Sequence, residues 1–248
     1  MPYISGRHVV AEALAARRSI RRILIAVDAE AALAVLLNRA RDTGVAVQRL
    51  DRRALTRLAD SERHQGVVAE VDEFITWDLE PVLADAIGRG GVLLALDQIQ
   101  DPQNLGSLIR SAEAFGVEGL VLPRHRSASV TPLVERSSAG AIEHLRVVEV
   151  TNLTRALQHM KRDGVWTVGL DPAGSDRFEG IDLRGPLCVV VGAEGAGMSR
   201  LVLEECDYRV CLPTVGRVAS LNAAVAGSIA LWEIFRRRQK ARSEDSAD

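Results

Sequence analysis

After Gly91 the chain alternates short apolar runs with segments of helical periodicity, and this alternation limits the possible folds more than any other feature. The apolar runs are four to six residues long and almost uninterrupted, which is typical of strands buried on both faces of a parallel sheet. The expected strands are residues 92–96, 119–122, 145–150, 165–170, 187–191 and 208–212. The expected helices are residues 105–115, 132–140, 153–161, 199–206 and 221–237. The pattern therefore predicts an α/β domain with a mostly parallel sheet that is covered by helices on both faces.

Residues 1–72 predict a separate, smaller α/β unit. Strands are expected at 20–27, 45–50 and 67–71, with a helix at 30–43 that ends at Gly44 and a helix at 54–59 that Asp51 caps. The pattern weakens from 73 to 90, where a connector leads into the glycine-rich residues 88–91. We therefore expect a first domain at 1–72, a linker at 73–90, a second domain at 91–238 and a disordered tail at 239–248.

The charge is divided unevenly between these regions. The whole chain has a net charge of -2, but residues 1–72 hold 12 Lys and Arg against 9 Asp and Glu, whereas residues 73–235 hold 14 against 21. A basic front region beside an acidic rear region indicates an RNA-facing module attached to a separate domain. Ordinary solvated surfaces explain the same charges equally well.

Three cysteines, Cys188, Cys206 and Cys211, have no metal-ligand spacing, so no metal site is expected. Cys188 and Cys211 lie in apolar strands, and we expect them to be buried, reduced thiols, which favours a cytoplasmic location. No signal peptide is expected at the start of the chain, and no apolar run approaches the ~18 residues of a membrane span. The sequence therefore predicts a cytoplasmic protein with no membrane partner.

Polar and glycine residues gather in three loops that follow expected strands, where ligands of open α/β sheets tend to bind. The first loop leads through Asn104 into a helix that carries Arg110 almost two turns further on. Asn104 could be only the N-cap of this helix, and Arg110 could pair only with Glu113 or Asp101. Taken alone, this loop does not distinguish a functional site from ordinary helix structure.

The second and third loops are equally ambiguous when each is taken alone. The second loop, Gly192-Ala193-Glu194-Gly195-Ala196-Gly197, could bring backbone amides close to a ligand or form only a tight turn. Its spacing is not the G-x-G-x-x-G of a dinucleotide fold, which disfavours a nicotinamide oxidoreductase. The third loop ends at Ser220-Leu221-Asn222, where Ser220 could be simply the N-cap of the last helix, with no functional role.

Together and in this order, the three loops resemble the three motifs of the SpoU (TrmH-like) RNA ribose 2′-O-methyltransferases of the SPOUT class. The residues that carry the resemblance are Asp101-Pro102-x-Asn104-Leu105-Gly106 with Arg110, then Gly192-Ala193-Glu194-Gly195-x-Gly197-Met198, then Leu212-Pro213 with Ser220-Leu221-Asn222-x-x-Val225-Ala226. The front segment is similar to the substrate-binding domain of the bacterial 23S rRNA guanosine 2′-O-methyltransferase, a small fold that resembles those of ribosomal proteins. This second similarity rests on Gly6-Arg7-His8-Val9-Val10-x-Glu12-Ala13-Leu14 and His64-Gln65-Gly66.

The resemblance implies a trefoil knot in the second domain and S-adenosylmethionine as the cofactor. By motif, Gly192, Leu212 and Leu221 would contact the cofactor. Arg110 would be the catalytic cation that acts on the ribose 2′-hydroxyl.

Further residues are assigned by the same motifs. Asn104 and Glu194 would fix the arginine and the loop geometry, while Ser220 and Asn222 would help to hold the ribose. The candidate RNA contacts are Arg7, His8, His64 and Gln65, where His64 suits a structural role equally well.

The implied activity is 2′-O-methylation of a guanosine in 23S rRNA. A tRNA ribose methyltransferase of the same class and a catalytically silent RNA-binding partner of the ribosome are the alternatives. Family members are homodimers with the last helix at the interface. The apolar face of that helix suits a dimer interface or packing inside one subunit, and it consists of Leu221, Val225, Ile229, Trp232 and Ile234.

Overall fold

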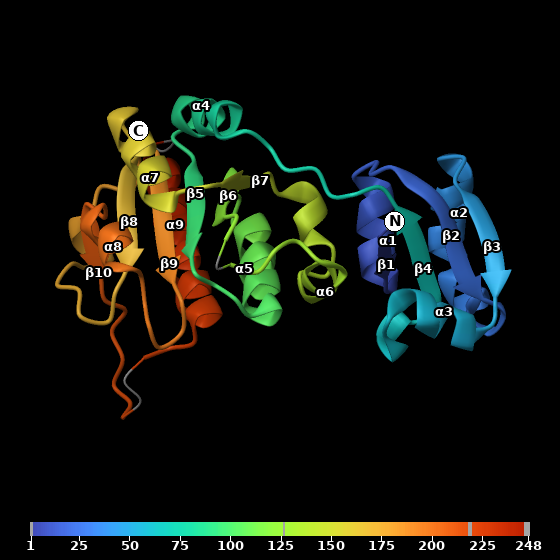
Figure 1. Ribbon diagram of the computed structural model, residues 1–248. Helices are drawn as coiled ribbons and strands as arrows, with labels where there is room; N and C mark the ends of the chain where they lie inside the picture. Colours follow the sequence, from blue (N-terminus) through green and yellow to red (C-terminus); the bar gives the residue numbers. More distant parts are fainter. Residues whose placement is uncertain (1, 126, 218–219, 246–248) are drawn as a thin grey trace. The chain divides into compact units, whose positions relative to one another are not determined.

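The computed structural model describes residues 2–125, 127–217 and 220–245, which divide into two compact units (Figure 1). The first unit contains residues 1–75 together with 130–144, and the second contains residues 76–129 and 145–248. The segment 130–144 lies within the range expected for the second domain, yet it packs with the first unit. Helix α4 (Leu79–Arg89) occupies most of the expected linker and belongs to the second unit.

The first unit contains a sheet with the strand order β1-β4-β2-β3, in which β2 and β3 are parallel and β4 is antiparallel to both of its neighbours. The strands are β1 (Tyr3–Ser5), β2 (Ile20–Ala26), β3 (Ala46–Leu50) and β4 (Val67–Val71). The helices are α1 (Arg7–Ala15), α2 (Ala34–Asp42), α3 (Arg52–Ala59) and α6 (Pro132–Ser137). The expected cap of α3 is confirmed, because Asp51 Oδ1 accepts a hydrogen bond of 2.8 Å from the backbone N–H of Ala54.

A buried ion-pair network holds residues 130–144 in the first unit. Arg18 Nη1 donates to Glu135 Oε1 at 2.8 Å and to Glu143 Oε1 at 2.7 Å. The three side chains are nearly inaccessible, with exposed fractions of 9%, 5% and 4%. Burial raises the pKa of the Glu135 carboxyl, whereas the Arg18 charge opposes that shift. Because breaking one partner of a buried ion pair leaves an uncompensated charge, this network fixes α6 firmly on the first unit.

The second unit contains a fully parallel sheet with the strand order β10-β8-β9-β5-β6-β7. The strands are β5 (Val92–Asp97), β6 (Gly119–Pro123), β7 (Val147–Val150), β8 (Trp166–Leu170), β9 (Leu187–Gly192) and β10 (Tyr208–Val210). The helices other than α4 are α5 (Pro102–Ala114), α7 (Leu153–Arg162), α8 (Arg200–Glu204) and α9 (Ala223–Asp245). The expected α/β class and mostly parallel sheet are confirmed, while the trefoil knot stays a prediction.

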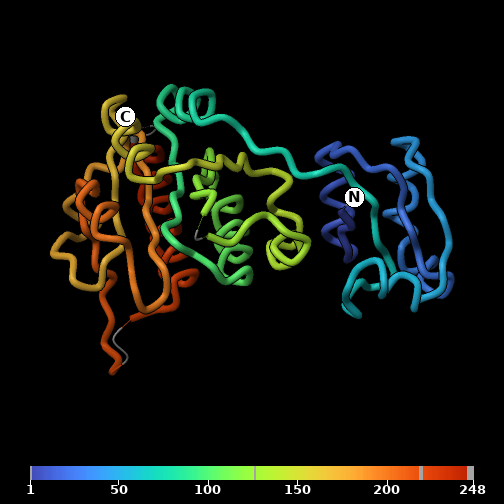
Figure 2. Tube along the Cα trace, viewed as in Figure 1, coloured from blue at the N-terminus to red at the C-terminus, as the bar shows by residue number. Residues whose placement is uncertain are grey.

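Helices cover both faces of this sheet. Helices α4, α7 and α8 pack on one face, where Cys188 and Val190 of β9 point into the core. Helices α5 and α9 pack together on the other face, and α9 runs along β9, as the red and green segments of Figure 2 show. Gly227 permits this contact, because a Cβ atom there would lie 2.4 Å from Leu108 Cδ2 and 3.2 Å from Val191 Cγ2. The alternation of Val190 and Val191 between the two faces is the strand periodicity that a doubly covered sheet requires.

The end of the chain differs from the expected disordered tail. Helix α9 continues through Asp245, so the expectation is wrong for residues 239–245, and residues 246–248 lie outside the described residues. An ion pair within this extension, from Lys240 Nζ to Glu244 Oε1 at 3.7 Å, supports the helix there. In the part of the chain that the structure describes, no helix has the length and hydropathy to cross a membrane.

Candidate active site

A cavity of about 380 Å³ opens at the carboxyl ends of β8, β9 and β10, where a parallel sheet is expected to bind its ligand. Its walls come from the strand ends, the glycine loop 192–197 and the start of α9. The lining residues that the argument uses are Leu170, Asp171, Gly192, Glu194, Leu212, Ser220 and Leu221. The three candidate cofactor contacts, Gly192, Leu212 and Leu221, therefore share one cavity.

The glycine loop is a closed turn that only a glycine can begin. The backbone N–H groups of Ala193 and Gly197 each donate to the carbonyl of the other, at 3.0 and 2.8 Å. A Cβ atom on Gly192 would lie 2.3 Å from the carbonyl carbon of Gly197 and from the nitrogen of Met198. Since both of these atoms belong to the backbone, no side-chain rotation relieves the contact, and the loop needs glycine at position 192.

Asp97 holds the far end of the same loop. It is the last residue of β5, its exposed fraction is only 5%, and its Oδ2 accepts a hydrogen bond of 2.6 Å from the backbone N–H of Ser199. A buried carboxylate needs such a partner, and this one fixes where the loop rejoins the chain. Sequence reasoning gave Asp97 no role, although a carboxylate directly after an apolar strand is a signal that could have drawn attention to it.

Asn222 connects the three loops. Its Nδ2 donates to Asn104 Oδ1 at 3.0 Å and to Glu194 Oε2 at 2.8 Å. Its Oδ1 accepts from the backbone N–H groups of Ala224 at 2.9 Å and Val225 at 3.2 Å, so the same side chain caps α9. The structure therefore brings Asn104, Glu194 and Asn222 together, and we call these three residues the amide hub.

Two capping alternatives from the sequence are corrected by these contacts. Asn104 does not cap α5, because Asp101 occupies the N-cap position and its Oδ1 accepts from the backbone N–H of Gln103 at 3.0 Å. Asn222 rather than Ser220 makes the capping bonds of α9, and Ser220 is an exposed residue at the cavity wall. Asn104 and Ser220 are thus both free for roles at the site.

Arg110 lies on α5 and does not line the cavity of its own chain. Its side chain is exposed and makes no hydrogen bond or ion pair with another described residue. The expected alternative, pairing with Glu113 or Asp101, is not observed. An unpaired, exposed guanidinium is available to a phosphate group.

Asp171 is a cavity residue that sequence reasoning missed. It follows β8, and its Oδ1 accepts a hydrogen bond of 2.9 Å from the backbone N–H of Ala173. Together with Glu194 it places two carboxylates in a cavity whose walls include Leu170 and Leu212. This combination suits a ligand that has a flat apolar part and a positive charge.

The candidate RNA contacts lie in the first unit. Arg7 and His8 are exposed at the start of α1, and Gln65 Oε1 accepts from the backbone N–H of Arg7 at 2.8 Å. His64 differs, because only 2% of it is exposed. Its Nε2 lies 3.2 Å from Thr56 Oγ1, and its Nδ1 accepts from Gly66 N. Burial lowers the pKa of His64, and its ring is unavailable to RNA, so the structural alternative replaces the expected contact.

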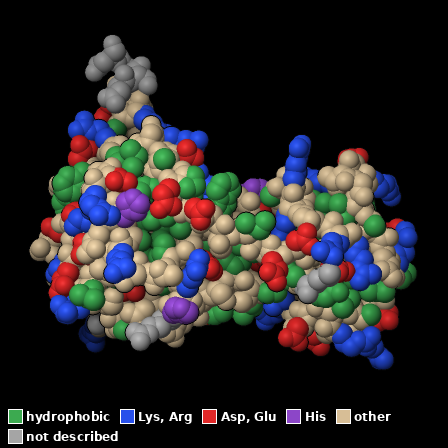
Figure 3. Space-filling model, turned by 45° about the horizontal axis from the view of Figure 1, so that its top comes forward, with side chains coloured by type: hydrophobic (Ala, Val, Ile, Leu, Met, Phe, Trp, Pro, Cys, Tyr) green, Lys and Arg blue, Asp and Glu red, His purple; other side chains and the backbone are tan. Residues whose placement is uncertain are grey.

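The charges of the first unit are mixed on the face drawn in Figure 3, where blue Arg side chains lie among red Asp and Glu side chains. Several arginines are paired with carboxylates, for example Arg49 with Glu30 at 2.5 Å and Arg52 with Asp28 at 2.7 Å. Paired arginines compete poorly for phosphate, so the net charge of this region alone does not locate an RNA surface.

The cysteines are free thiols in the described part of the chain. Burial raises the pKa of the Cys188 and Cys206 thiols, for Cys206 to about 12, which keeps both protonated and unreactive. Cys211 is half-buried at the cavity wall. Among the described residues, no group of three or more His, Cys, Asp or Glu side chains is placed to hold a metal ion.

Known proteins match both units. Residues 91–232 match the SpoU rRNA Methylase family, and residues 3–77 match the family described as RNA 2′-O ribose methyltransferase substrate binding. A protein of Bacillus subtilis strain 168, named as a TrmH family tRNA/rRNA methyltransferase, is 38% identical over 239 residues, which is 95% of this chain and 96% of that protein. A protein of the same name from Staphylococcus saprophyticus is 39% identical over 238 residues, which is 95% of each chain.

A solved structure with a similar fold is the SpoU methyltransferase AviRb from Streptomyces viridochromogenes in complex with AdoMet. It superimposes with a TM-score of 0.80 at 27% sequence identity and covers 96% of this chain and 90% of that chain. The similarity therefore extends over both units and all three loops.

Proposed function

Since the chain belongs to the SpoU rRNA methylase family, it is an S-adenosylmethionine-dependent RNA 2′-O-methyltransferase, and we propose that it methylates a guanosine ribose in 23S rRNA. The observation that carries this proposal is the amide hub, which joins all three loops beside one cavity. The match of residues 3–77 to a ribose methyltransferase substrate-binding family supports an RNA ribose as the acceptor. The choice of a 23S rRNA guanosine rests on the motifs around Arg7 and His64-Gln65-Gly66 in that segment.

The residues of the cavity fit S-adenosylmethionine. Leu170, Leu212 and Leu221 offer apolar walls to an adenine, and the closed turn at Gly192 presents backbone groups to its polar edge. Asp171 and Glu194 supply negative charge for a ligand that carries a sulfonium and an ammonium group. When bound, S-adenosylmethionine supplies an electrophilic methyl group.

The chain must do the remaining work on the RNA. A ribose 2′-hydroxyl is a poor nucleophile at neutral pH, so it has to be oriented and its developing negative charge stabilised. We assign this role to Arg110, because its guanidinium is exposed and unpaired among the described residues. A guanidinium stays protonated and therefore does not act as the base. Arg110 instead holds the target phosphate and stabilises the oxyanion, and that phosphate can accept the proton.

The amide hub positions the reacting groups. Asn222 ties Glu194 of the glycine loop to Asn104, which lies one to two turns before Arg110 on α5. We assign Ser220 to contact with the ribose, and its position at the cavity wall supports this assignment. These contacts give the loop geometry and the arginine a common support.

We further propose that the protein is a homodimer through α9. Val225, Ile229 and Trp232 expose 47%, 41% and 47% of their surface, although they are apolar and share one face of the helix. Phe115 extends this surface, with its ring centroid 5.7 Å from that of Trp232. Ile234 is buried inside the chain, so the expected apolar face divides between an inner and an outer part.

The proposal is tested by methyl transfer. Purified protein with saturating S-adenosylmethionine carrying a labelled methyl group is expected to label unmodified 23S rRNA, and digestion is expected to place the label on a guanosine 2′-oxygen. Labelling of tRNA alone would select the tRNA alternative, and the relatives named as tRNA/rRNA methyltransferases make that comparison necessary. Absence of label in every RNA would contradict the activity itself.

A further inference from the structure

A second cavity lies at the amino ends of the strands of the parallel sheet, whereas the cofactor cavity lies at the carboxyl ends. It has a volume of about 260 Å³ and is formed by the α4–β5 turn, the α5–β6 turn and the second half of α9. These two turns precede β5 and β6, whereas the cofactor cavity lies at strand carboxyl ends, so the two cavities are separate. The charged residues of this second cavity are Arg89, Glu118, Arg238 and Arg242.

Arg238 is the unusual member of this group. Its Nη1 donates to the carbonyl of Gly90 at 2.5 Å and its Nη2 to the carbonyl of Gly185 at 2.6 Å, so backbone oxygens hold the side chain in place. Its Nε is buried and has no hydrogen-bond acceptor among the described residues. The Arg238 guanidinium also forms no ion pair with a described residue. Burial and the nearby charge of Arg242 lower the pKa of Arg238 to about 10, so the guanidinium remains charged at neutral pH. Arg238 is half-buried with an inaccessible Nε, and a cation that is taken partly out of water without an anion is costly.

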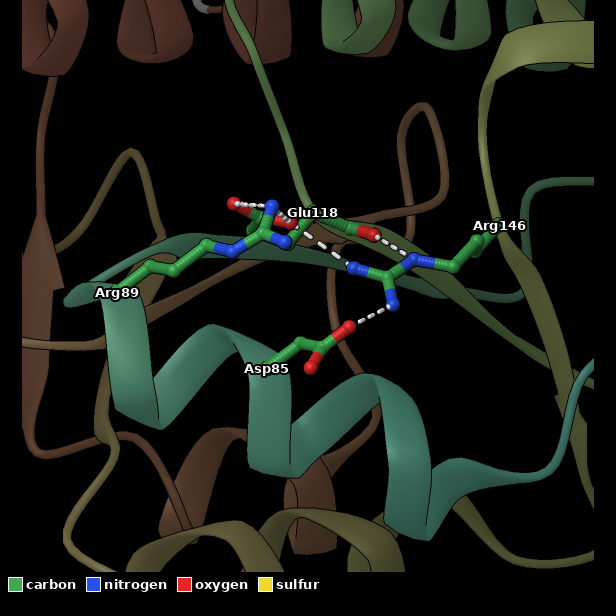
Figure 4. Close-up of polar contacts among 4 residues, drawn as sticks. All are labelled: Asp85, Arg89, Glu118 and Arg146. Atoms are coloured by element: carbon green, nitrogen blue, oxygen red, sulfur yellow. Dashed lines mark hydrogen bonds and ion pairs between the residues drawn. The ribbon is translucent and has the colours of Figure 1, made fainter.

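Glu118, the carboxylate that lines the cavity, is already bound elsewhere. Figure 4 shows it between two arginines, with Arg146 Nη2 at 2.9 Å and Arg89 Nη1 at 3.4 Å. Arg146 also reaches Asp85 at 2.6 Å. These four side chains form a neutral set of two carboxylates and two guanidinium groups. Glu118 therefore does not serve as the counterion of Arg238.

We propose that this cavity is an anion site that binds a phosphate group through Arg238, with Arg242 at its margin. A guanidinium has more N–H donors than the two backbone bonds of Arg238 use, and its planar array matches phosphate oxygens. The cavity volume is below that of pockets for drug-sized ligands, which favours a small group such as phosphate or pyrophosphate. The phosphate comes either from a free phosphate compound or from the backbone of RNA, and the chemistry of recognition is the same for both.

The test is a calorimetric titration of the full chain with inorganic pyrophosphate at low salt. S-adenosylmethionine is kept saturating so that the cofactor cavity is filled. We expect saturable binding that weakens about tenfold or more in Arg242→Gln and Arg238→Gln, because each removes a charge-assisted contact. Arg242→Gln is the safer variant, since Arg238 also binds the carbonyls of Gly90 and Gly185. Arg155→Gln is the matched control, because Arg155 is an exposed arginine of α7 that does not line either cavity.

The outcomes separate the sources of the phosphate. If the site binds RNA, a fragment of 23S rRNA displaces pyrophosphate and binds less tightly to Arg242→Gln. If the site binds a free phosphate compound, the RNA leaves the titration unchanged. The inference is overturned if the wild-type chain shows no saturable binding, or if Arg238→Gln and Arg242→Gln both bind pyrophosphate as the wild type and the Arg155→Gln control do. A cavity filled by a second copy of this chain would also overturn it, with no pyrophosphate binding and an altered dimer dissociation constant in Arg242→Gln. The pyrophosphate outcomes that overturn the inference do not depend on which RNA is methylated.

Discussion

Replacement of Asn222 by Ala separates the two tasks of this side chain, the cap of α9 and the connection of the loops. Loss of the two capping bonds from Ala224 and Val225 costs about 1 kcal/mol of unfolding free energy. Loss of the bonds to Asn104 and Glu194 lowers the unfolding free energy by a further amount of about 0.5–1.5 kcal/mol. This cost is small because Glu194 is exposed and water can replace its partner. For a chain of this size, a destabilisation of 1 kcal/mol lowers the melting temperature by about 2–4 °C. The protein is therefore expected to remain folded at 25 °C.

The effect of Asn222→Ala on activity is expected to be much larger than its effect on stability. Without the hub, Glu194 and the glycine loop are no longer tied to α5, and misplacement of reacting groups by about 1 Å can lower the rate about a hundredfold. The assay is methyl transfer under saturating cofactor and RNA, measured beside thermal unfolding of the same preparation.

A matched control comes from another helix cap. Asn152 caps α7 by accepting from the backbone N–H of Arg155 at 3.0 Å, but it is not part of the hub and does not line the cavity. Asn152→Ala is expected to lose about the same stability and to keep its activity. Asn222→Asp is expected to give the converse result. A carboxylate keeps the cap of α9, so stability is retained, but it places a second negative charge beside Glu194, so activity is lost. If Asn222→Ala retains the wild-type rate, or if Asn152→Ala loses as much activity, the hub does not position the reaction.

Three further predictions concern the cofactor, the RNA and the first unit. Gly192→Ala is expected to weaken S-adenosylmethionine binding and to destabilise the second unit by about 1–3 kcal/mol, both measured by calorimetry. In the control Gly180→Ala a Cβ atom has open space, so the cofactor dissociation constant and the unfolding free energy are expected to stay unchanged. Arg110→Ala is expected to abolish methyl transfer and to leave the cofactor dissociation constant unchanged, and an equal loss of both would place Arg110 at the cofactor instead. The pKa of His64 is lowered by burial from its ordinary 6.5, so the unfolded chain takes up this proton first as the pH falls. The stability that depends on neutral His64 is therefore complete above pH 6.5 and declines below it, and melting curves of wild type and His64→Gln between pH 7.5 and 5.5 are expected to converge toward acid.

Much of the second unit follows from local sequence, because strands buried on both faces leave uninterrupted apolar runs. Strands β5, β6 and β9 begin where the runs begin, at Val92, Gly119 and Leu187. Strand β1 gave no such signal, since it has only three residues and lies at the edge of its sheet. The placement of 130–144 in the first unit was equally invisible, because Arg18 and Glu135 are 117 positions apart.

The helix caps show where a local signal existed but was assigned to the wrong residue. Asp101 and Asn104 both have capping side chains, yet Pro102 is at the first turn of α5, and proline favours that position directly after the cap. This spacing identifies Asp101 as the cap. Ser220 and Asn222 offered no equivalent distinction, since their assignment depends on where α9 begins.

The cofactor cavity depends on bonds between segments that are distant in the chain, and this determines what local sequence can predict about it. Asp97 and Ser199 are 102 positions apart, and Asn222 and Asn104 are 118 apart. One bond fixes the end of the glycine loop on β5, and the other fixes the start of α9 on α5. Because each is a single side-chain contact between two elements, neither leaves a periodic pattern in the sequence. The same contacts make the loop and α9 mutually dependent, so a change at the start of α9 is expected to alter cofactor binding even where it touches no cofactor atom.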